Sequence, residues 1–83
     1  MTEETSKIIA EYIAADILKQ PGRALAPSAK LITSGLVDSM SLVDLALFVE
    51  ERFGVRIDDT ELNAQTFDSL ADLAALVENR RNA

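Results

Sequence analysis

Large apolar residues recur at helical spacing in three separate segments of this chain, and that spacing restricts the fold to packed helices. In the middle segment they follow i, i+3, i+7 and i+11, so all four fall on one face of a helix. The inward-facing residues predicted in this way are Ile9, Ile13 and Ile17 in the first segment, Leu42, Leu45, Val49 and Phe53 in the second, and Leu70, Leu73 and Val77 in the third. The alternating stretch Val55-Arg56-Ile57 is too short to build a sheet.

Start and stop signals bound the first two segments. Thr2 is a predicted cap for the first helix, and Pro21-Gly22 predicts its end near Gln20,. The helical pattern returns at Ser39 and ends at Gly54, the residue type that most often closes a helix,.

Two weaker signals follow in the second half of the chain. Asp58 and Glu61 have the spacing of a capping box, which predicts a single short helical turn around Leu62,. The last helix is predicted to begin near Asp68, an acceptable cap, and the paired arginines near its end suit the negative end of its dipole,.

The elements together predict an all-α fold: one domain, residues 1–83, built as a small four-helix bundle with three main helices, one short helix and a long first loop. That loop, residues 21–38, is long for a compact domain. It carries apolar side chains that would be costly to leave in water, so we expect it to be pinned across the bundle by Leu25, Leu31, Ile32 and Leu36,.

Charge is distributed unevenly along the chain. The formal net charge is −6, yet residues 38–72 alone hold nine acidic residues against Arg52 and Arg56, a balance of −7. The electrostatic field of so many negative charges repels the phosphates of nucleic acid and attracts basic protein surfaces. Apolar runs are far shorter than the ~20 residues of a membrane span, and Met1-Thr2-Glu3-Glu4 holds no hydrophobic signal,. We expect a cytoplasmic monomer, with neither nucleic acid nor membrane as partner.

A serine stands where the long loop becomes the second helix, in the string Ser34-Gly35-Leu36-Val37-Asp38-Ser39-Met40. A nucleophilic serine needs an adjacent base, yet the chain has no histidine and only three lysines, Lys7, Lys19 and Lys30. Asp38 is too weak a base for an alcohol. The sequence leaves Lys30 as a possible base, but it indicates no oxyanion hole and no substrate pocket. We therefore predict no catalytic residue.

A metal site has little support either, because Asp58, Asp59 and Glu61 lack the spacing of a calcium loop and a solvated acidic turn explains them,. Two interpretations of Asp38-Ser39 remain. Either residue can cap the helix. Alternatively, Ser39 carries a phosphodiester, which free amides and the dipole at a helix N-terminus stabilise. In that case the serine is a substrate for modification.

The stretch Leu31–Met40 resembles the attachment motif of acyl carrier proteins, and residues 42–57 and 66–73 resemble that family's second helix with its following loop and the start of its last helix. The likeness covers essentially the whole chain. It implies an acyl-carrier-like bundle with a 4′-phosphopantetheine arm, donated by coenzyme A, on Ser39 beside Asp38 and Met40. It also implies a non-catalytic carrier of a thioester, a phosphopantetheinyl transferase that modifies it, and acyl- or aminoacyl-loading ligases or synthases as partners.

The residues after the serine depart from the pattern of many fatty-acid-synthesis carriers, which have leucine and then an acid where this chain has Met40 and Ser41. The string 35–40 looks closer to D-alanyl carriers and to free-standing carriers of secondary metabolism. The resemblance therefore implies a small acyl or aminoacyl load rather than a long fatty chain.

The helix that begins at Ser39 also has an outward stripe. Its periodicity predicts an exposed docking face for partner enzymes, made of Val43, Asp44, Leu47, Glu50 and Glu51,. In the alternative interpretation, Val43 and Leu47 are further core residues and the acidic residues form a merely solvated face. A second class of function also stays open, an acidic helical adaptor without a prosthetic group, regulated by phosphorylation at Ser39 or Ser41.

Overall fold

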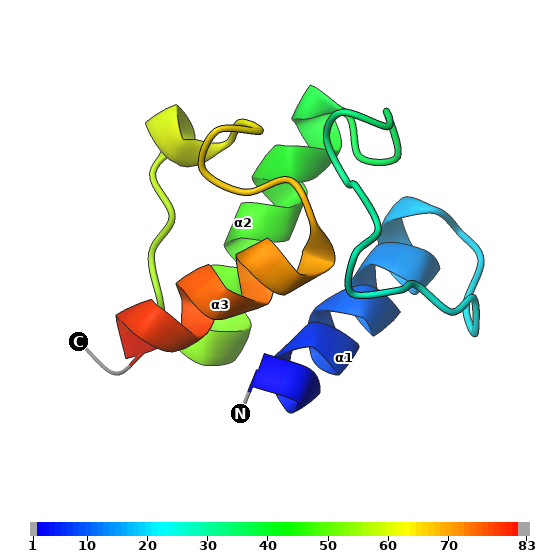
Figure 1. Ribbon diagram of the computed structural model, residues 1–83, viewed down its shortest axis with the longest axis horizontal. Coiled ribbons are helices and arrows are strands. Elements are labelled where there is room, and N and C mark those ends of the chain that lie inside the picture. The colour runs from blue at the N-terminus through cyan, green and yellow to red at the C-terminus, as the bar shows by residue number, and fades with distance from the viewer. Residues whose placement is uncertain (1, 82–83) are drawn as a thin grey trace.

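The structure, a computed structural model, describes residues 2–81 of the chain, and side chains from residue 4 to residue 81. Its elements are α1 (Thr2–Tyr12), which continues as the π-helical turn η1 (Ile13–Ile17), then α2 (Ser39–Phe53), the short 3₁₀ helix η2 (Asp59–Glu61) and α3 (Leu70–Arg81). No strand occurs in the described range, in which Lys30 and Ser69 form an isolated bridge. The predicted all-α bundle is confirmed (Figure 1).

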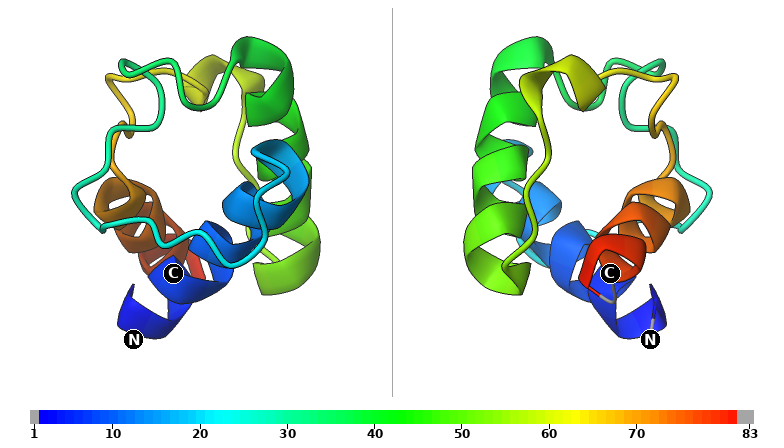
Figure 2. Two further views of the ribbon diagram at one scale, coloured as in Figure 1. Left: turned by 90° about the vertical axis from the view of Figure 1, so that its right-hand side faces the viewer. Right: turned by 90° about the vertical axis from the view of Figure 1, so that its left-hand side faces the viewer.

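One hydrophobic core joins the three main helices to the two long connections. α1 and α3 pack against each other, and α2 stands beside this pair (Figure 2). The buried apolar cluster consists of Ile9, Ile13, Leu31, Val37, Leu42, Leu45, Val49, Val55, Ile57, Phe67, Leu70, Leu73 and Val77. Each fully buried aliphatic side chain contributes roughly 1.5–3 kcal/mol. None of the helices between residues 2 and 81 is long and apolar enough to cross a membrane.

The first helix ends earlier than predicted. It is helical to Ile17, and the Leu18 amide donates to the Ile13 carbonyl over 2.8 Å in the wider π-helical pattern. Lys19 then takes a left-handed conformation with φ of 57°, which stops the helix before Gln20 and Pro21,. Ile17, predicted to face inward, is only half-buried at this end of the helix. The capping role predicted for Thr2 concerns a side chain outside the described ones and stays a prediction.

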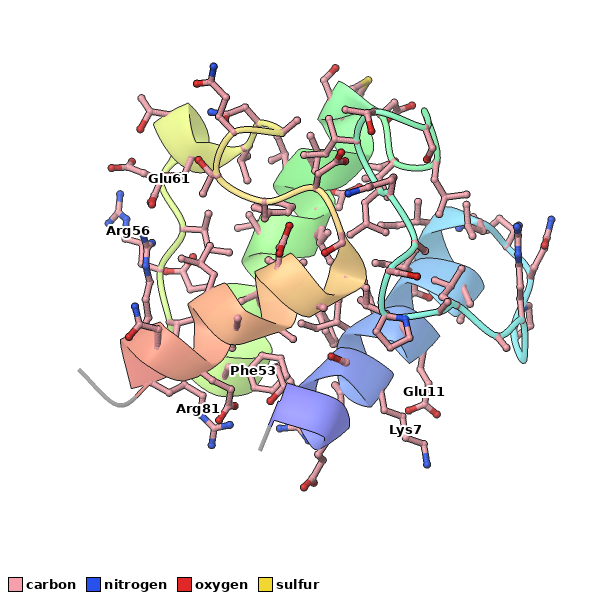
Figure 3. The ribbon with its side chains drawn as sticks, in the orientation of Figure 1. Lys7, Glu11, Phe53, Arg56, Glu61 and Arg81 are labelled. Carbon is pink, nitrogen blue, oxygen red and sulfur yellow. The ribbon has the colours of Figure 1, made fainter. Side chains whose placement is uncertain are left out.

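The second helix has the predicted boundaries. Asp38 caps its start, and Gly54 closes it in the left-handed conformation with φ of 71°,. Phe53, however, is wrongly predicted as a full core residue, since it is only half-buried. The ring lies at the end of the helix, where the guanidinium carbons of Arg52 and Arg81 lie 5.4 and 5.7 Å from its centroid. Figure 3 shows Arg81 beside the ring. It therefore packs on the core from outside.

The start of the last helix corrects a second prediction. Ser69, not Asp68, caps α3: its hydroxyl oxygen accepts a hydrogen bond from the Asp72 amide over 3.0 Å. Asp68 serves the first loop instead, because its carboxylate accepts hydrogen bonds from the amides of Ile32 and Thr33, each over 3.0 Å, and from the Thr33 hydroxyl over 2.6 Å. The two residues are adjacent and both are good caps, so the choice between them rests on tertiary contacts.

The long first loop is pinned, as predicted. Leu31 is fully buried, while Leu25, Ile32 and Leu36 pack half-buried against the core. The Leu31 amide also donates to the Asp68 carbonyl over 2.6 Å. The capping box of η2 is likewise confirmed, with Asp58 in the cap position and Glu61 as its partner.

Candidate functional site

Ser39 is the first residue of α2, and the loop before it is built to hold it there. The Val37 amide donates to the Leu31 carbonyl over 2.9 Å, and Val37 is almost fully buried, so the chain is anchored two residues before the serine. Gly35 allows the turn between them, with φ of 78°, a value that favours glycine,. Together with the Asp68 contacts, these bonds fix the position of Ser39 relative to α3.

Asp38 organises the helix start. Its carboxylate accepts a hydrogen bond from the Ser41 amide over 2.8 Å. This backbone bond, followed by hydrogen bonding to the Ser41 side chain and the Met40 amide, holds the pKa of Asp38 below its usual value,. The carboxyl group is therefore ionised at neutral pH. Because the Ser41 amide is already bonded, it is not free for a phosphate on Ser39. The helix dipole still favours a negative charge at this end.

The Ser39 hydroxyl is free and accessible. Ser39 is exposed, and Met40 beside it is 80% exposed. No hydrogen bond links this hydroxyl to Lys30 or to any other described residue, so nothing in residues 2–81 activates it as a nucleophile,. An unencumbered hydroxyl at an open helix start fits a phosphodiester linked to a long flexible arm.

All five residues of the predicted docking face are exposed along α2, with Val43 47% and Leu47 51% exposed. The helix is anchored elsewhere: the Tyr12 ring stacks on Phe48 with centroids 4.0 Å apart, and the Tyr12 hydroxyl donates to the Asp44 carbonyl over 3.3 Å. The alternative in which Val43 and Leu47 are core residues is therefore wrong.

Sequence reasoning missed a groove beside this face. The segment 54–62, which we call the strap, runs from the end of α2 through η2 and faces the helix across a hollow of about 250 Å³. Its lining residues are Val43, Ala46, Leu47, Glu50, Arg56, Ile57, Asp58 and Asp59. The signal for the strap in the sequence was the alternation of Val55-Arg56-Ile57. In the structure Val55 and Ile57 are buried and Arg56 is exposed.

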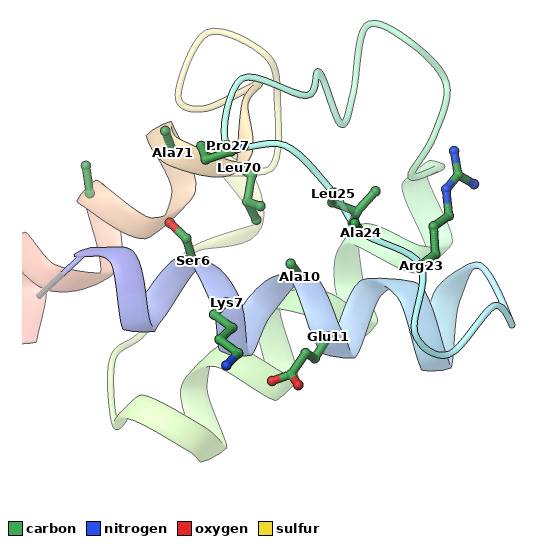
Figure 4. Close-up of a pocket in the computed structure, with 11 residues that line it drawn as sticks. Ser6, Lys7, Ala10, Glu11, Arg23, Ala24, Leu25, Pro27, Leu70 and Ala71 are labelled. Carbon is green, nitrogen blue, oxygen red and sulfur yellow. The ribbon is translucent and has the colours of Figure 1, made fainter.

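A larger hollow of about 680 Å³ lies between α1, the first loop and the start of α3 (Figure 4). Its walls include Ala10, Leu25, Pro27, Leu70 and Ala71, with no residue of α2 among them. Ser39 is therefore not part of it. No group of three or more potential metal-ligating side chains occurs among the described residues.

Comparison with known proteins gives a consistent result. A family model described as a phosphopantetheine attachment site matches residues 9–77. An acyl carrier protein of Thermotoga maritima is 36% identical over 52 residues, which span 63% of this chain and 62% of that protein. An acyl carrier protein of Campylobacter hominis is 34% identical over 61 residues, spanning 68% of this chain and 75% of that one.

The fold also has a solved counterpart. A crystal structure of an acyl carrier protein from Thermotoga maritima superposes with a TM-score of 0.75 at 21% sequence identity, over 98% of this chain and 91% of that one. At this identity the likeness concerns the arrangement of the helices.

Proposed function

Because the chain belongs to the acyl carrier protein family, with a phosphopantetheine attachment domain, we propose that it carries an acyl or aminoacyl group on a 4′-phosphopantetheine arm attached to Ser39 and delivers it to partner enzymes. The observation that carries the proposal is the position of Ser39, exposed and without a hydrogen-bond partner among residues 2–81 at the start of α2, inside the matched range. The arm supplies a thiol that holds the load as a thioester.

The role of this chain in the modification is to present one oxygen. The Ser39 hydroxyl oxygen forms the bond to phosphorus, the adenosine bisphosphate part of coenzyme A leaves, and the hydroxyl proton passes to a base of the transferase. Asp38 holds the first turn of α2 and Val37 anchors the loop, so the oxygen projects from a rigid base. A tether then keeps the load concentrated near each docked enzyme, without catalysis by the carrier itself.

The direct test is intact-mass analysis after incubation with coenzyme A and a broad-specificity phosphopantetheinyl transferase. We expect one addition of the mass of a 4′-phosphopantetheine group. An acidic helical adaptor without a prosthetic group would gain nothing, and phosphorylation at Ser39 or Ser41 would then be the modification to look for. We expect the protein to be a monomer, which light scattering of the purified protein checks, and to be cytoplasmic, which fractionation of the cells that produce it checks.

The docking face supports weak, electrostatically steered contacts with the transferase and with loading ligases or synthases. The double change Asp44→Lys and Glu50→Lys is expected to lower transferase kcat/KM by about tenfold at low salt, since it reverses the charge met by a basic partner. The difference should shrink in salt, because the Debye length falls from about 30 Å at 0.01 M to about 8 Å at 0.15 M. Folding should be barely affected, as exposed charges contribute little.

The matched control for this experiment is Glu11→Lys with Asp16→Lys, the same charge change at two exposed acids of the first helical segment. This control should retain nearly all of the wild-type rate. Equal rates for the two double variants at both salt concentrations would mean that overall charge, rather than the face of α2, governs recognition.

The load is proposed to be small. Met40 and Ser41 follow the serine where many fatty-acid carriers have leucine and an acid, and Met40 projects into solvent. We expect the holo protein, offered to cell extract with labelled amino acids and with short and long carboxylic acids, to form thioesters with an amino acid or a short acid. Preferential loading with long-chain acids would refute this proposal and leave the carrier function intact.

A further inference from the structure

Arg80 connects α3 to two residues of the strap through three hydrogen bonds. The Arg80 Nη1 donates to the Arg56 carbonyl over 2.8 Å and to Glu61 Oε1 over 2.9 Å, while its Nη2 donates to Glu61 Oε2. Glu61 Oε1 also accepts from the Asp58 amide over 3.0 Å. The guanidinium therefore binds a side chain and a backbone carbonyl at once, with the bidentate geometry for which arginine is suited (Figure 3 labels Arg56 and Glu61),.

Hydrogen bonds from Arg80 attach the strap to α3. Among the described residues, no backbone–backbone hydrogen bond joins residues 55–57 to another element. Val55 and Ile57 are buried and hold the strap to the core, but apolar packing is non-directional and does not set its distance from α2,. Hydrogen bonding to Arg80, with that of the Asp58 amide, lowers the pKa of Glu61 to about 2, so the contact persists at all but strongly acidic pH,.

The same strap forms one wall of the groove beside the docking face. Val43, Leu47 and Ile57 supply apolar surface, and the two walls carry acids, Glu50 on α2 and Asp58 with Asp59 on the strap. The hollow of about 250 Å³ has room for one aliphatic side chain,. An excess of acids over the single cation Arg56 favours a partner surface whose inserted side chain is flanked by lysine or arginine.

We propose that Arg80 is a positioning residue for partner docking: by holding the strap against α3, it keeps the groove shaped to receive one apolar side chain from a basic enzyme surface. The inference rests on the proposed function, in which α2 faces the partner enzymes. Arg80 itself touches neither Ser39 nor the partner, and acts through Glu61 and the strap.

The neighbouring Arg81 is a matched control. It has the same charge, in the same turn of the same helix, but its ion pair of 3.0 Å is with Glu78 of α3 itself. Arg80→Gln and Arg81→Gln therefore remove the same charge near the same helix end, and only the first removes a contact to the strap. Glu61→Gln tests the contact from its other side, should Arg80→Gln fold poorly.

Two measurements together decide the proposal. Hydrogen exchange of the Glu61 and Leu62 amides should accelerate in Arg80→Gln and Glu61→Gln and stay near wild type in Arg81→Gln. Transferase KM should rise about fivefold, the low end of coupling between two sites, in the first two variants, with kcat unchanged because Ser39 is untouched.

Each outcome has a definite meaning. Unchanged exchange in Arg80→Gln, or equal acceleration in Arg81→Gln, overturns the positioning role. Faster exchange with an unchanged KM also overturns it, since the strap would then be loosened without consequence for docking. A wild-type protein that the transferase does not modify at all overturns the proposed function together with this inference, and is recognised before any variant is compared.

Discussion

Ser39→Ala is expected to abolish phosphopantetheine attachment completely, because the change removes the exposed hydroxyl oxygen to which we assign the arm. Intact mass after transferase treatment should show no addition. The fold should be unaffected, since the Ser39 hydroxyl bonds to no described residue and the capping carboxylate of Asp38 stays in place,. Far-UV circular dichroism of the variant checks that point.

Ser41→Ala is the control for this experiment. Ser41 lies two residues further along the same turn. Alanine at this position keeps the backbone amide that bonds to Asp38 and loses only the secondary hydrogen bond from the Ser41 side chain. This variant should be modified like the wild type. The chain has a second Asp-Ser pair at 68–69. Ser69 is buried, however, and its hydroxyl oxygen accepts a hydrogen bond from the Asp72 amide, so it offers no free oxygen. A full phosphopantetheine addition on Ser39→Ala would show that the assignment of the site is wrong.

Leu73→Ala is expected to remove a large part of the stability of the protein. Leu73 is fully buried on α3, within the core that α1, α2 and the strap share. Truncating such a leucine costs about 2–5 kcal/mol through lost burial and the cavity left behind, against about 5–15 kcal/mol for a whole domain. The urea midpoint should fall markedly at an unchanged m-value.

Phe53→Ala is the comparison for this variant. The phenyl ring is larger than the leucine side chain, but it is half-buried and covered partly by two arginines, so less of its area is removed from water,. We expect a smaller fall in the urea midpoint than for Leu73→Ala. A larger fall for Phe53→Ala would restore the sequence-based assignment of Phe53 as a core residue.

Local signals in the sequence predicted the elements that local interactions decide. Asp38 and Gly54 bound α2 as expected, and the capping box of Asp58 and Glu61 forms η2, because each depends on residues at most four positions apart,. The end of the first helix was misplaced because the prediction took Pro21-Gly22 as the stop signal. The helix ends at Ile17 instead, in a π-helical turn followed by the left-handed Lys19, and nothing in the sequence pattern indicates either feature,.

The features that sequence reasoning missed are held by distant partners. The choice of Ser69 over Asp68 as a cap depends on Thr33, 35 residues away from Asp68. The hydrogen bonds between Arg80 and Glu61 join residues that are 19 positions apart and lie in different elements. No period or motif encodes such contacts. The serine at the helix start and the face of α2 were therefore predictable, whereas the alternation of Val55-Arg56-Ile57 indicated only which side of the strap is buried, and the groove itself required the structure.

The bonds between Asp68 and the first loop divide that loop into two parts with different evolutionary freedom. Residues 31–38 are bonded at Ile32 and Thr33 to Asp68, just before α3, and lead directly to the serine, so a single inserted residue there would move Ser39 relative to these anchors. Residues 21–24 are exposed, and their length can vary at little cost because loop closure depends only weakly on length,. Homologues should therefore differ in loop length before residue 25 and keep a constant spacing from residue 31 to Ser39.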